Sequence, residues 1–471
     1  MSPAALYALL PILILVLGAT VLLMLGAWWR QNRLLIGGGI LVALAAAGAA
    51  ITLTTSVTEV GAMFATTAYA RFFTVVWALL AAATLLLSLR YGDKKHFPGG
   101  EYTSLVLFAG GGMALLSSAT SLIGLFLGLE SFTLALYILI AFRKDCAQGA
   151  EAGLKYLVMG AVATGFIAFG IALIYASSGS FHLPEAFAAL QSASELRSIA
   201  LLGWALLLVA IGFKVSLVPF HLWTPDVYQG APAPISGLLA AGSKGAVLAS
   251  LVPLFAGLAG GAETLRPLLA LLAVVTMLVG SLCALRQVNL KRMLAYSSVV
   301  HMGTVLIGLI VGSSDGRSAV IFYVIAYAVS TVAAFAVITS LSASEERERQ
   351  DYDDWRGLGY KHPWRGGVLA VALFSLAGVP PSAGFLAKFG IFHAALAAGY
   401  PSLALFGVLA ALLSIYYYLK VVILLFMSEQ EASEGPATRL SEHLVLLVSA
   451  GAVLVLGLYP GPLYNLITSL L

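Results

Sequence analysis

Apolar runs of about 20 residues recur along this whole 471-residue sequence, and they restrict what it can fold into more than any other feature. An α-helix of that length crosses the hydrocarbon core of a bilayer, which is about 30 Å thick. Only 10% of the residues are charged, against roughly a quarter in soluble domains, so the polar surface is too small to coat a water-soluble globule. The sequence therefore predicts an all-α membrane protein that crosses the bilayer many times.

Charged residues and Gly/Pro clusters divide the sequence into about fourteen predicted spans. They begin near residues 5, 33, 71, 102, 121, 150, 199, 234, 266, 292, 317, 363, 402 and 440. The first run has no basic residue ahead of it and is long enough to cross the bilayer. We therefore expect a retained first helix and not a cleaved signal.

Lysine and arginine are divided very unevenly between the two sets of predicted loops. Loops after odd-numbered spans hold sixteen: Arg30, Arg33, Arg90, Lys94, Lys95, Arg143, Lys144, Arg286, Lys291, Arg292, Arg347, Arg349, Arg356, Lys361, Arg365 and Arg439. Loops after even-numbered spans hold only four: Arg71, Arg197, Arg266 and Arg317. Because cytoplasmic loops carry the excess of basic residues, the odd-numbered loops are predicted to be cytoplasmic and both termini periplasmic.

Prolines interrupt two predicted spans. Pro219 and Pro225 lie at the end of the seventh span, and Pro380 and Pro381 lie inside the twelfth. Proline removes a backbone donor, which in lipid requires that other groups satisfy the freed carbonyls. Pro219 and Pro380 are 161 residues apart, and the fourth and ninth spans begin about 164 residues apart. The equal offsets indicate a five-span unit repeated once in inverted orientation, as in many transporters.

The repeat divides the chain into four predicted parts. Residues 1–97 form a three-span segment, 100–262 the first repeat (spans four to eight), 264–430 the second repeat (spans nine to thirteen) and 436–471 the last span. One detail departs from this symmetry, because Lys214 precedes its proline whereas Lys388 follows its proline pair.

Five lysines fall inside predicted spans: Lys155, Lys214, Lys244, Lys388 and Lys420. A charge at the bilayer centre costs at least about 2.5 kcal/mol, so each one needs a partner, water or a function. Lys420 lies near a span end and can extend to the interface. Desolvated lysine can exchange a proton near neutral pH, which arginine cannot do. The absence of arginine among the central cations therefore favours proton transfer over packing.

Glu130 lies about ten residues into the fifth span, with no nearby residue in the sequence to neutralise it. A pair with Lys214 across helices would let movement of one charge change the proton affinity of the other. The alternative is a static ion pair that fixes helix packing. Lys244 is a candidate to receive a proton from the Lys214 region and Lys388 to be the last station before release, although a structural role stays open for both.

Other ionisable residues are secondary candidates. Glu151 and Lys155 are spaced i,i+4 with the acid first, which fits a local pair or a proton-entry site. His301 lies roughly 13 Å along its helix from Arg292 and is either a proton relay or a structural histidine. His221 and Asp226 lie beside the break in the seventh span, where capping and loop anchoring are the default expectations.

Several other chemistries have no sequence signal. Cys146 and Cys283 lack the spacings of zinc or iron–sulfur sites and are expected to be small buried residues. There is no Walker sequence, dinucleotide fingerprint, haem-attachment motif or catalytic-triad signature, and the basic residues form no nucleic-acid-binding patch. The mixed-charge run at residues 345–356 is predicted to be a solvated linker.

Four segments together resemble a known family: FKVSLVPFHLWTPDVYQGAP, GSKGAVLA, LKRMLAYSSVVHMG and GVPPSAGFLAKF. They resemble the antiporter-like subunits of bacterial NADH:quinone oxidoreductase (respiratory complex I), and the first segment looks like the subunit N type. The resemblance implies that Glu130 and Lys214 form an interacting pair, that Lys244 connects the two half-channels, and that Lys388 serves the second, with His301 between the halves.

The same resemblance implies a proton-translocating subunit of the bacterial inner membrane, with other membrane-arm subunits as partners. It would carry no cofactor, because NADH, FMN, the iron–sulfur clusters and quinone belong to partner subunits. Two alternatives remain open. One is a subunit of a multisubunit Na⁺/H⁺ antiporter or membrane-bound hydrogenase, and the other is a passive scaffold in which the buried charges only hold helices together.

Overall fold

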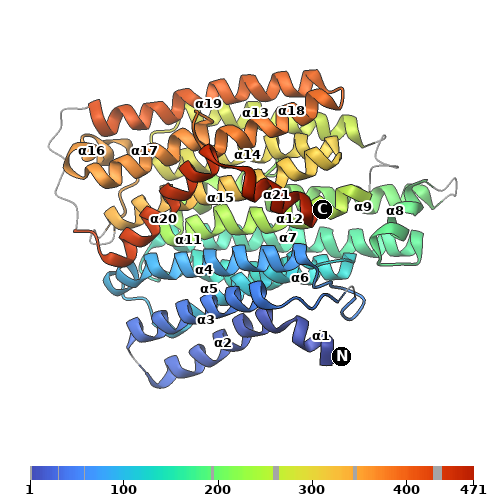
Figure 1. Ribbon diagram of the computed structural model, residues 1–471, viewed down its shortest axis with the longest axis horizontal. Helices are drawn as coiled ribbons and strands as arrows, with labels where there is room; N and C mark the ends of the chain where they lie inside the picture. The colour runs from blue at the N-terminus through green and yellow to red at the C-terminus, as the bar shows by residue number, and fades with distance from the viewer. Residues whose placement is uncertain are drawn as a thin grey trace.

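The predicted all-α fold is confirmed. The computed structural model describes residues 3–29, 31–57, 59–191, 196–257, 265–342, 347–427 and 437–471. Within these residues the regular structure is helical, and the β-pairing amounts to isolated bridges. Figure 1 shows the long helices lying side by side along one common direction, so that they form a single bundle.

The first half of the chain contains the following elements: α1 Pro3–Ala8, α2 Leu10–Trp28, α3 Asn32–Thr52, α4 Ala68–Lys94, α5 Gly99–Ser117, α6 Leu122–Ile140, α7 Ala147–Ser178, α8 Leu183–Gln191, α9 Arg197–Val215, α10 Trp223–Gly230, α11 Ala233–Leu238, the π-helical turn η1 Leu239–Ser243 and α12 Lys244–Gly257. The second half contains α13 Arg266–Leu285, α14 Leu290–Val311, α15 Ser314–Ser342, the 3₁₀ turn η4 Tyr352–Trp355, α16 Leu358–Lys361, α17 Pro363–Ala377, α18 Ala383–Ala397, α19 Pro401–Met427, α20 Leu440–Leu458 and α21 Gly461–Leu470.

Twelve helices among the described residues are long and apolar enough to cross a membrane, counting 233–256 as one. The shorter apolar helices α17 and α18 have 15 residues each. The predicted number of about fourteen spans therefore stays a prediction. The predicted last span is not one helix, because α20 ends at Leu458 and α21 begins at Gly461. Pro460 lies between them, and a proline inside a helix removes a hydrogen bond and kinks or breaks the helix.

The helices that carry Lys244 and His301 form the centre of the bundle together with α15. In the apolar windows of α14, of 233–256 and of α15, 94%, 89% and 83% of the residues are buried. The corresponding share is 22% in α2 and 33% in α19, the helices at opposite edges of Figure 1. Polar side chains on the central helices are therefore shielded from lipid by the outer helices.

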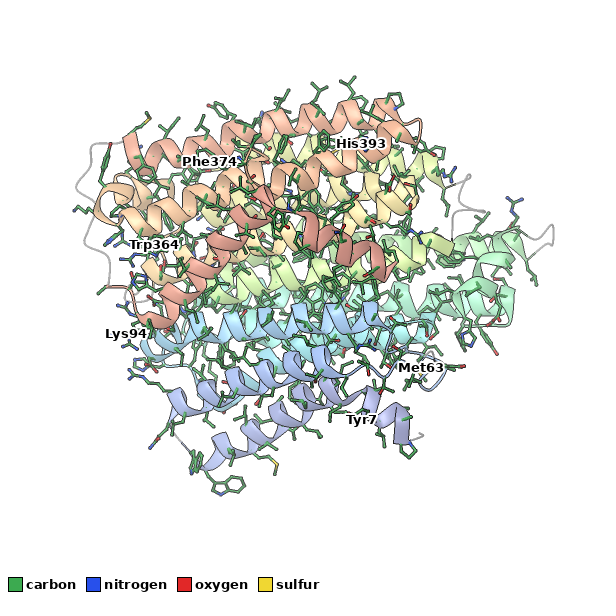
Figure 2. The ribbon with its side chains drawn as sticks, in the orientation of Figure 1. Tyr7, Met63, Lys94, Trp364, Phe374 and His393 are labelled. Carbon is green, nitrogen blue, oxygen red and sulfur yellow. The ribbon has the colours of Figure 1, made fainter. Side chains whose placement is uncertain are left out.

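Basic residues such as Arg33 and Arg439 gather at one end of the bundle, and both chain termini lie toward the other end (Figure 1). Figure 2 shows Lys94 and Trp364 at the first end, with Tyr7 and Met63 at the opposite end. At the first end Asp93 accepts ion pairs from Arg33 at 2.7 Å and Arg439 at 3.7 Å. Arg30 lies outside the described residues. This arrangement fits the predicted alternation of basic loops, and the side of the membrane that each end faces stays a prediction.

Helices α2 and α5 pack with their backbones in close contact. A Cβ atom added at Gly26 would lie 2.7 Å from Cα of Gly100, and the same holds in reverse. Small residues at helix crossings allow this approach, which is a common way to pack helices in membranes. The contact joins the N-terminal helices to α5, which packs against α6, the helix that carries Glu130.

Candidate functional site

Glu130 and Lys214 form the ion pair expected from the sequence. The Lys214 ammonium on α9 is fully buried and lies 3.6 Å from Oε1 of Glu130 on α6. A separation of 3.6 Å is longer than a hydrogen bond. Hydroxyl groups instead form hydrogen bonds with both residues. Lys214 donates to Oγ1 of Thr133 at 2.9 Å, and Thr164 donates to Oε1 of Glu130 at 2.8 Å.

Lys244 lies at the centre of the bundle, at the point where the π-helical turn η1 gives way to α12. Its ammonium donates to Oγ of Ser298 on α14 at 2.6 Å and lies 5.4 Å from the centre of the Tyr228 ring. Among the described residues it has no carboxylate partner within ion-pair distance. A π-helical turn changes the direction of the residues that follow, and such turns are frequent at functional sites.

His301 on α14 continues the polar path beyond Lys244. Its Nδ1 lies 2.6 Å from the Tyr323 hydroxyl and its Nε2 lies 3.1 Å from the Tyr418 hydroxyl. The Tyr418 hydroxyl is also hydrogen-bonded to Ser297. Both ring nitrogens therefore have hydroxyl partners, which either neutral tautomer of histidine can use.

A very small cavity leads from His301 toward the break between α17 and α18. Its volume is about 10 Å³, which is space for about one water molecule, and its lining includes His301, Ser330, Ser375 and Gly384. The Ser330 and Ser375 hydroxyls are 2.7 Å apart, and Ser375 accepts from the Gly384 amide at 3.1 Å. Polar groups thus continue from His301 to the start of α18.

Lys388 on α18 reaches back across the break between α17 and α18 to the end of α17. The buried ammonium donates to the Ala377 carbonyl, the last residue of α17, at 2.8 Å, and lies 3.4 Å from Oγ of Ser414. Carbonyls at a helix C-terminus lack partners within the helix and attract cations. Pro380 and Pro381 lie between α17 and α18, so the predicted break is confirmed.

The break in the seventh predicted span differs in detail from the expectation. Pro219 lies in the break between α9 and α10, as predicted. Pro225, in contrast, is the third residue of α10, where its missing N–H costs nothing because the first helical amides have no partner within the helix. The prediction that Pro225 breaks the helix is therefore wrong, and a second break follows at Ala231 and Pro232.

The secondary candidates form a charge cluster at the basic end. Asp226 accepts from Lys155 and from Arg292, each at 2.7 Å, so it anchors α10 to α7 and α14. It makes no cap hydrogen bond, so the capping expectation is wrong and the anchoring expectation is confirmed. Lys155 also pairs with Glu151 at 2.7 Å. His221 is buried beside the Tyr296 ring.

The sequence analysis missed a buried ion pair. Lys291, assigned to a basic loop, is fully buried in the first turn of α14 and donates to Oε2 of Glu348 at 2.7 Å. Glu348 also accepts from the Tyr91 hydroxyl. Glu348 and Arg349 are 3% and 6% exposed, so the prediction of a solvated linker at residues 345–356 is wrong for them. Residues 345 and 346 lie outside the described residues.

The Lys291–Glu348 pair spans the break between α10 and α11. Lys291 donates to the Ala231 carbonyl at 2.6 Å, at the end of α10, and Glu348 accepts from the Ala233 amide at 2.9 Å, at the start of α11. A cation thus meets a helix C-terminus and an anion meets a helix N-terminus, which are the favourable signs for both helix dipoles. No local signal could reveal the pair, because its members are 57 residues apart.

The charge of Glu348 depends on these partners. Burial by itself raises the pKa of the Glu348 carboxyl, but the Lys291 charge, the hydrogen bonds from Lys291 and Tyr91 and the Ala233 amide together hold it below its ordinary value. Glu348 is therefore a charged residue in the interior, and its loss would leave Lys291 without a counter-charge.

In the part of the chain that the structure describes, the two cysteines and the metal-binding residue types form no further site. Cys146 and Cys283 are free and partly exposed, so the expectation of buried residues is wrong. Among the described residues, no three His, Cys, Asp or Glu side chains gather as metal ligands. Lys420, set aside as interfacial, places its ammonium 5.0 Å from the centre of the Tyr352 ring.

Comparison with known proteins decides the family. Residues 119–414 match the model of the NADH:quinone oxidoreductase/Mrp antiporter transmembrane family. The chain belongs to this family. Within the family, the protein of Geobacter metallireducens named NADH-quinone oxidoreductase subunit N is 43% identical over 472 residues, covering 100% of both chains. The protein of that name from Geotalea uraniireducens is 49% identical over 406 residues, or 86% of each chain.

A solved structure agrees with this family membership. A chain of respiratory complex I from Thermus thermophilus, determined with bound aureothin, is 33% identical and superposes with a TM-score of 0.83. The match covers 97% of this chain and 98% of that chain. Two of these three similar proteins are thus named as a subunit of NADH-quinone oxidoreductase, and the third is a chain of respiratory complex I.

Proposed function

We propose that this chain is a proton-translocating membrane-arm subunit of an NADH:quinone oxidoreductase, in which quinone reduction elsewhere in the complex drives proton pumping. The observation that carries the proposal is the set of three buried lysines, Lys214, Lys244 and Lys388, which lie among hydroxyl and imidazole groups. The helices that bear them contact one another in the order α9, α12, α14 and α18, with His301 on α14. The relatives named subunit N support the same assignment.

Each candidate has a role in this proposal. Movement of charge between Glu130 and Lys214 changes the proton affinity of Lys214, which then exchanges a proton with Lys244. His301 relays the proton through its two nitrogens toward Lys388, from which it is released. The cluster of Glu151, Lys155 and Asp226 gives the secondary entry site at the basic end; His221, beside the first break, is a further secondary candidate on the path.

The division of labour within the complex follows from this role. The chain acts as a translocase without redox chemistry of its own, and NADH, FMN, the iron–sulfur clusters and quinone are bound by partner subunits. The two five-helix units, 100–262 and 264–430, are inverted repeats. In support, Ser216 after α9 and Gly378 after α17 both adopt positive φ, at 64° and 86°, and are 162 residues apart.

Two other functions fit parts of the evidence. The family also includes Mrp-type antiporters, and co-purification of the neighbouring subunits distinguishes an antiporter or hydrogenase complex from the oxidoreductase. A passive scaffold would use the buried charges only to hold helices together. It predicts that neutralising Lys214 impairs assembly before it affects pumping.

Replacement of Lys214 tests the proposal. In membrane vesicles carrying Lys214→Ala we expect an assembled complex on a native gel, with proton pumping and coupled quinone reductase activity lowered at least about tenfold, as for loss of an acid–base group. Lys94→Ala, which removes an exposed lysine at the basic end, is the control and should leave both activities unchanged. Normal pumping in Lys214→Ala, or failure of that variant to assemble, would support the scaffold.

A further inference from the structure

A hollow at the basic end of the bundle has the shape and charge of a lipid-binding site. It has a volume of about 660 Å³ and lies between α2, α5 and α6 and the loops that follow α4 and α6. That volume is within the range of small-molecule pockets in proteins, about 300–1,000 Å³. It is separate from the buried lysines described above, none of which lines it.

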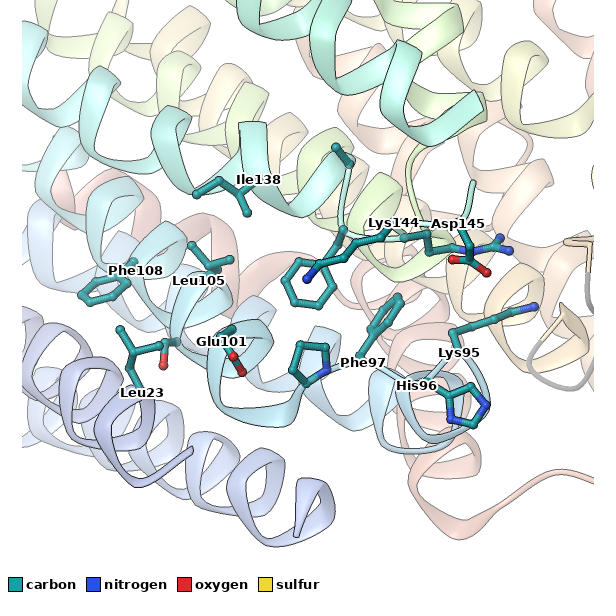
Figure 3. A pocket seen from close by; sticks show the side chains of 15 residues that line it. Leu23, Lys95, His96, Phe97, Glu101, Leu105, Phe108, Ile138, Lys144 and Asp145 are labelled. Carbon is teal, nitrogen blue, oxygen red and sulfur yellow. The ribbon is translucent and has the colours of Figure 1, made fainter. Parts of the chain in front are cut away.

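The lining changes from charged to apolar along the hollow. Figure 3 shows Lys95, His96, Lys144 and Asp145 at one end and Leu23, Leu105 and Phe108 at the other. Phe108 is nine residues into α5, a depth of about 14 Å along the helix. Leu23 and Ile138 are 41% and 54% exposed, so the apolar part opens on the lipid-facing surface. An occupant therefore needs a polar head and an apolar tail.

Three charges of the lining have no ion-pair partner among the described residues: Lys144, Glu101 and Asp145. All three are exposed to the hollow or its mouth. Lys95 and Arg143 also line the hollow but interact with other groups of the protein. Lys144 can therefore bind a phosphate, whereas the two unpaired carboxylates would repel a headgroup with negative charge alone. A headgroup that carries both a phosphate and a primary ammonium complements both signs.

We propose that this hollow binds one molecule of phosphatidylethanolamine. Its phosphate binds Lys144, its ammonium binds the carboxylate of Glu101 or Asp145, and an acyl chain lies along Leu105, Phe108 and Ile138. Because the hollow is lined by α2 as well as α5 and α6, the bound lipid joins the N-terminal helices to the first proposed repeat.

Photolabelling of the intact complex tests the proposal. The probe is phosphatidylethanolamine with a diazirine in one acyl chain, added at a low mole fraction to membranes that contain the complex. We expect labelled peptides from residues 97–108 and 138–145, and an excess of unlabelled phosphatidylethanolamine should compete more strongly than the same excess of phosphatidylglycerol. Equal competition by the two lipids would overturn the headgroup assignment and with it the proposal.

Two matched pairs of variants separate a built site from ordinary lipid contact. Ile138→Trp fills the hollow, whereas Leu134→Trp changes the same helix at a residue that is similarly exposed, 59% against 54%, and does not line it. Lys144→Glu removes the phosphate partner, whereas Lys94→Glu changes a lysine of the neighbouring polar hollow. We expect labelling to fall about fivefold in the first variant of each pair only.

Either of two results would overturn the site. Equal labelling of Ile138→Trp and Leu134→Trp would mean that the labelled lipid is part of the general bilayer. Failure to label these peptides in the unmodified complex, together with cross-linking of a Lys144→Cys variant to a neighbouring subunit, would mean that a protein helix fills the hollow. None of these readouts depends on proton pumping, so they test the lipid site independently of the proposed function.

Discussion

The partners of the buried lysines divide them into two kinds. Lys244 and Lys388 donate to hydroxyl or carbonyl oxygens, which can accept from a charged ammonium and also from a neutral amine. Lys214 has a carboxylate at 3.6 Å, whereas Lys291 has one at 2.7 Å together with the Ala231 carbonyl. Neutral or distant partners suit a residue that gains and loses a proton, and the close pair suits one whose charge is fixed.

Replacing the fixed counter-charge should destabilise the subunit. Glu348→Gln leaves Lys291 buried without an anion, at a cost of about 3–5 kcal/mol. We expect a lower midpoint of thermal unfolding of the detergent-solubilised complex, measured by loss of this subunit from the native-gel band. The double variant Lys291→Met with Glu348→Gln should recover part of the loss. An unchanged midpoint in Glu348→Gln would contradict a structural role for the pair.

The same pair gives stability a defined pH dependence. Because the pKa of folded Glu348 is below its ordinary value of 4.5, its contribution is fully present above about pH 4.5 and is lost as the pH falls through the folded-state pKa. The unmodified subunit should therefore lose more unfolding free energy than Glu348→Gln on acidification below pH 4.5. Asp353→Asn, at a carboxylate 79% exposed in the same loop, is the control and should behave like the unmodified subunit.

At the scale of elements, the helix breaks supply the backbone groups that bind buried charged side chains. The break after α17 leaves the Ala377 carbonyl free for Lys388. The break after α10 leaves the Ala231 carbonyl and the Ala233 amide for Lys291 and Glu348. In lipid these groups would otherwise be unsatisfied, so each break and its charged partner stabilise one another.

The N-cap of α18 should matter for function as well as for stability. The Ser382 hydroxyl accepts from the Phe385 amide and fixes the start of the helix that carries Lys388. Ser382→Ala should cost about 1 kcal/mol and lower coupled proton pumping. Thr67→Ala removes the matching cap of α4, far from the lysines in sequence, and should cost a similar amount while leaving pumping intact. Equal pumping by the two variants would argue against a positioning role for Ser382.

The sequence was sufficient for elements that depend on local pattern. Apolar runs give the helices, Pro219, Pro380 and Pro381 give two breaks, and isolated charges in apolar runs give the Glu130–Lys214 pair. It was insufficient where tertiary contacts decide. The burial of Glu348 and Lys291 depends on residues far along the chain, and Pro225 is acceptable in a first helical turn that the sequence alone did not locate.

At the scale of the whole molecule, the two ends of the bundle differ in charge, and this difference predicts how the protein lies in the membrane. In a background with Cys146→Ser and Cys283→Ser, Arg347→Cys should react with a membrane-impermeant maleimide in inside-out vesicles and Arg197→Cys in right-side-out vesicles. Both positions are exposed and lie in loops of opposite predicted sides. Reaction of both in the same vesicles would show that the predicted orientation, from the excess of basic residues in cytoplasmic loops, is wrong.

The Lys291–Glu348 pair also bears on how the chain is made. Lys291 leaves the ribosome 57 residues before Glu348, and the rest of α14 and all of α15 are synthesised in between. Until then Lys291 has no counter-charge, and the amide at the start of α11 has no acceptor from the loop. The break between α10 and α11, in the first half of the protein, is therefore completed only after the loop that contains Glu348, in the second half, has been translated. The two halves therefore cannot mature as independent membrane-inserted pieces.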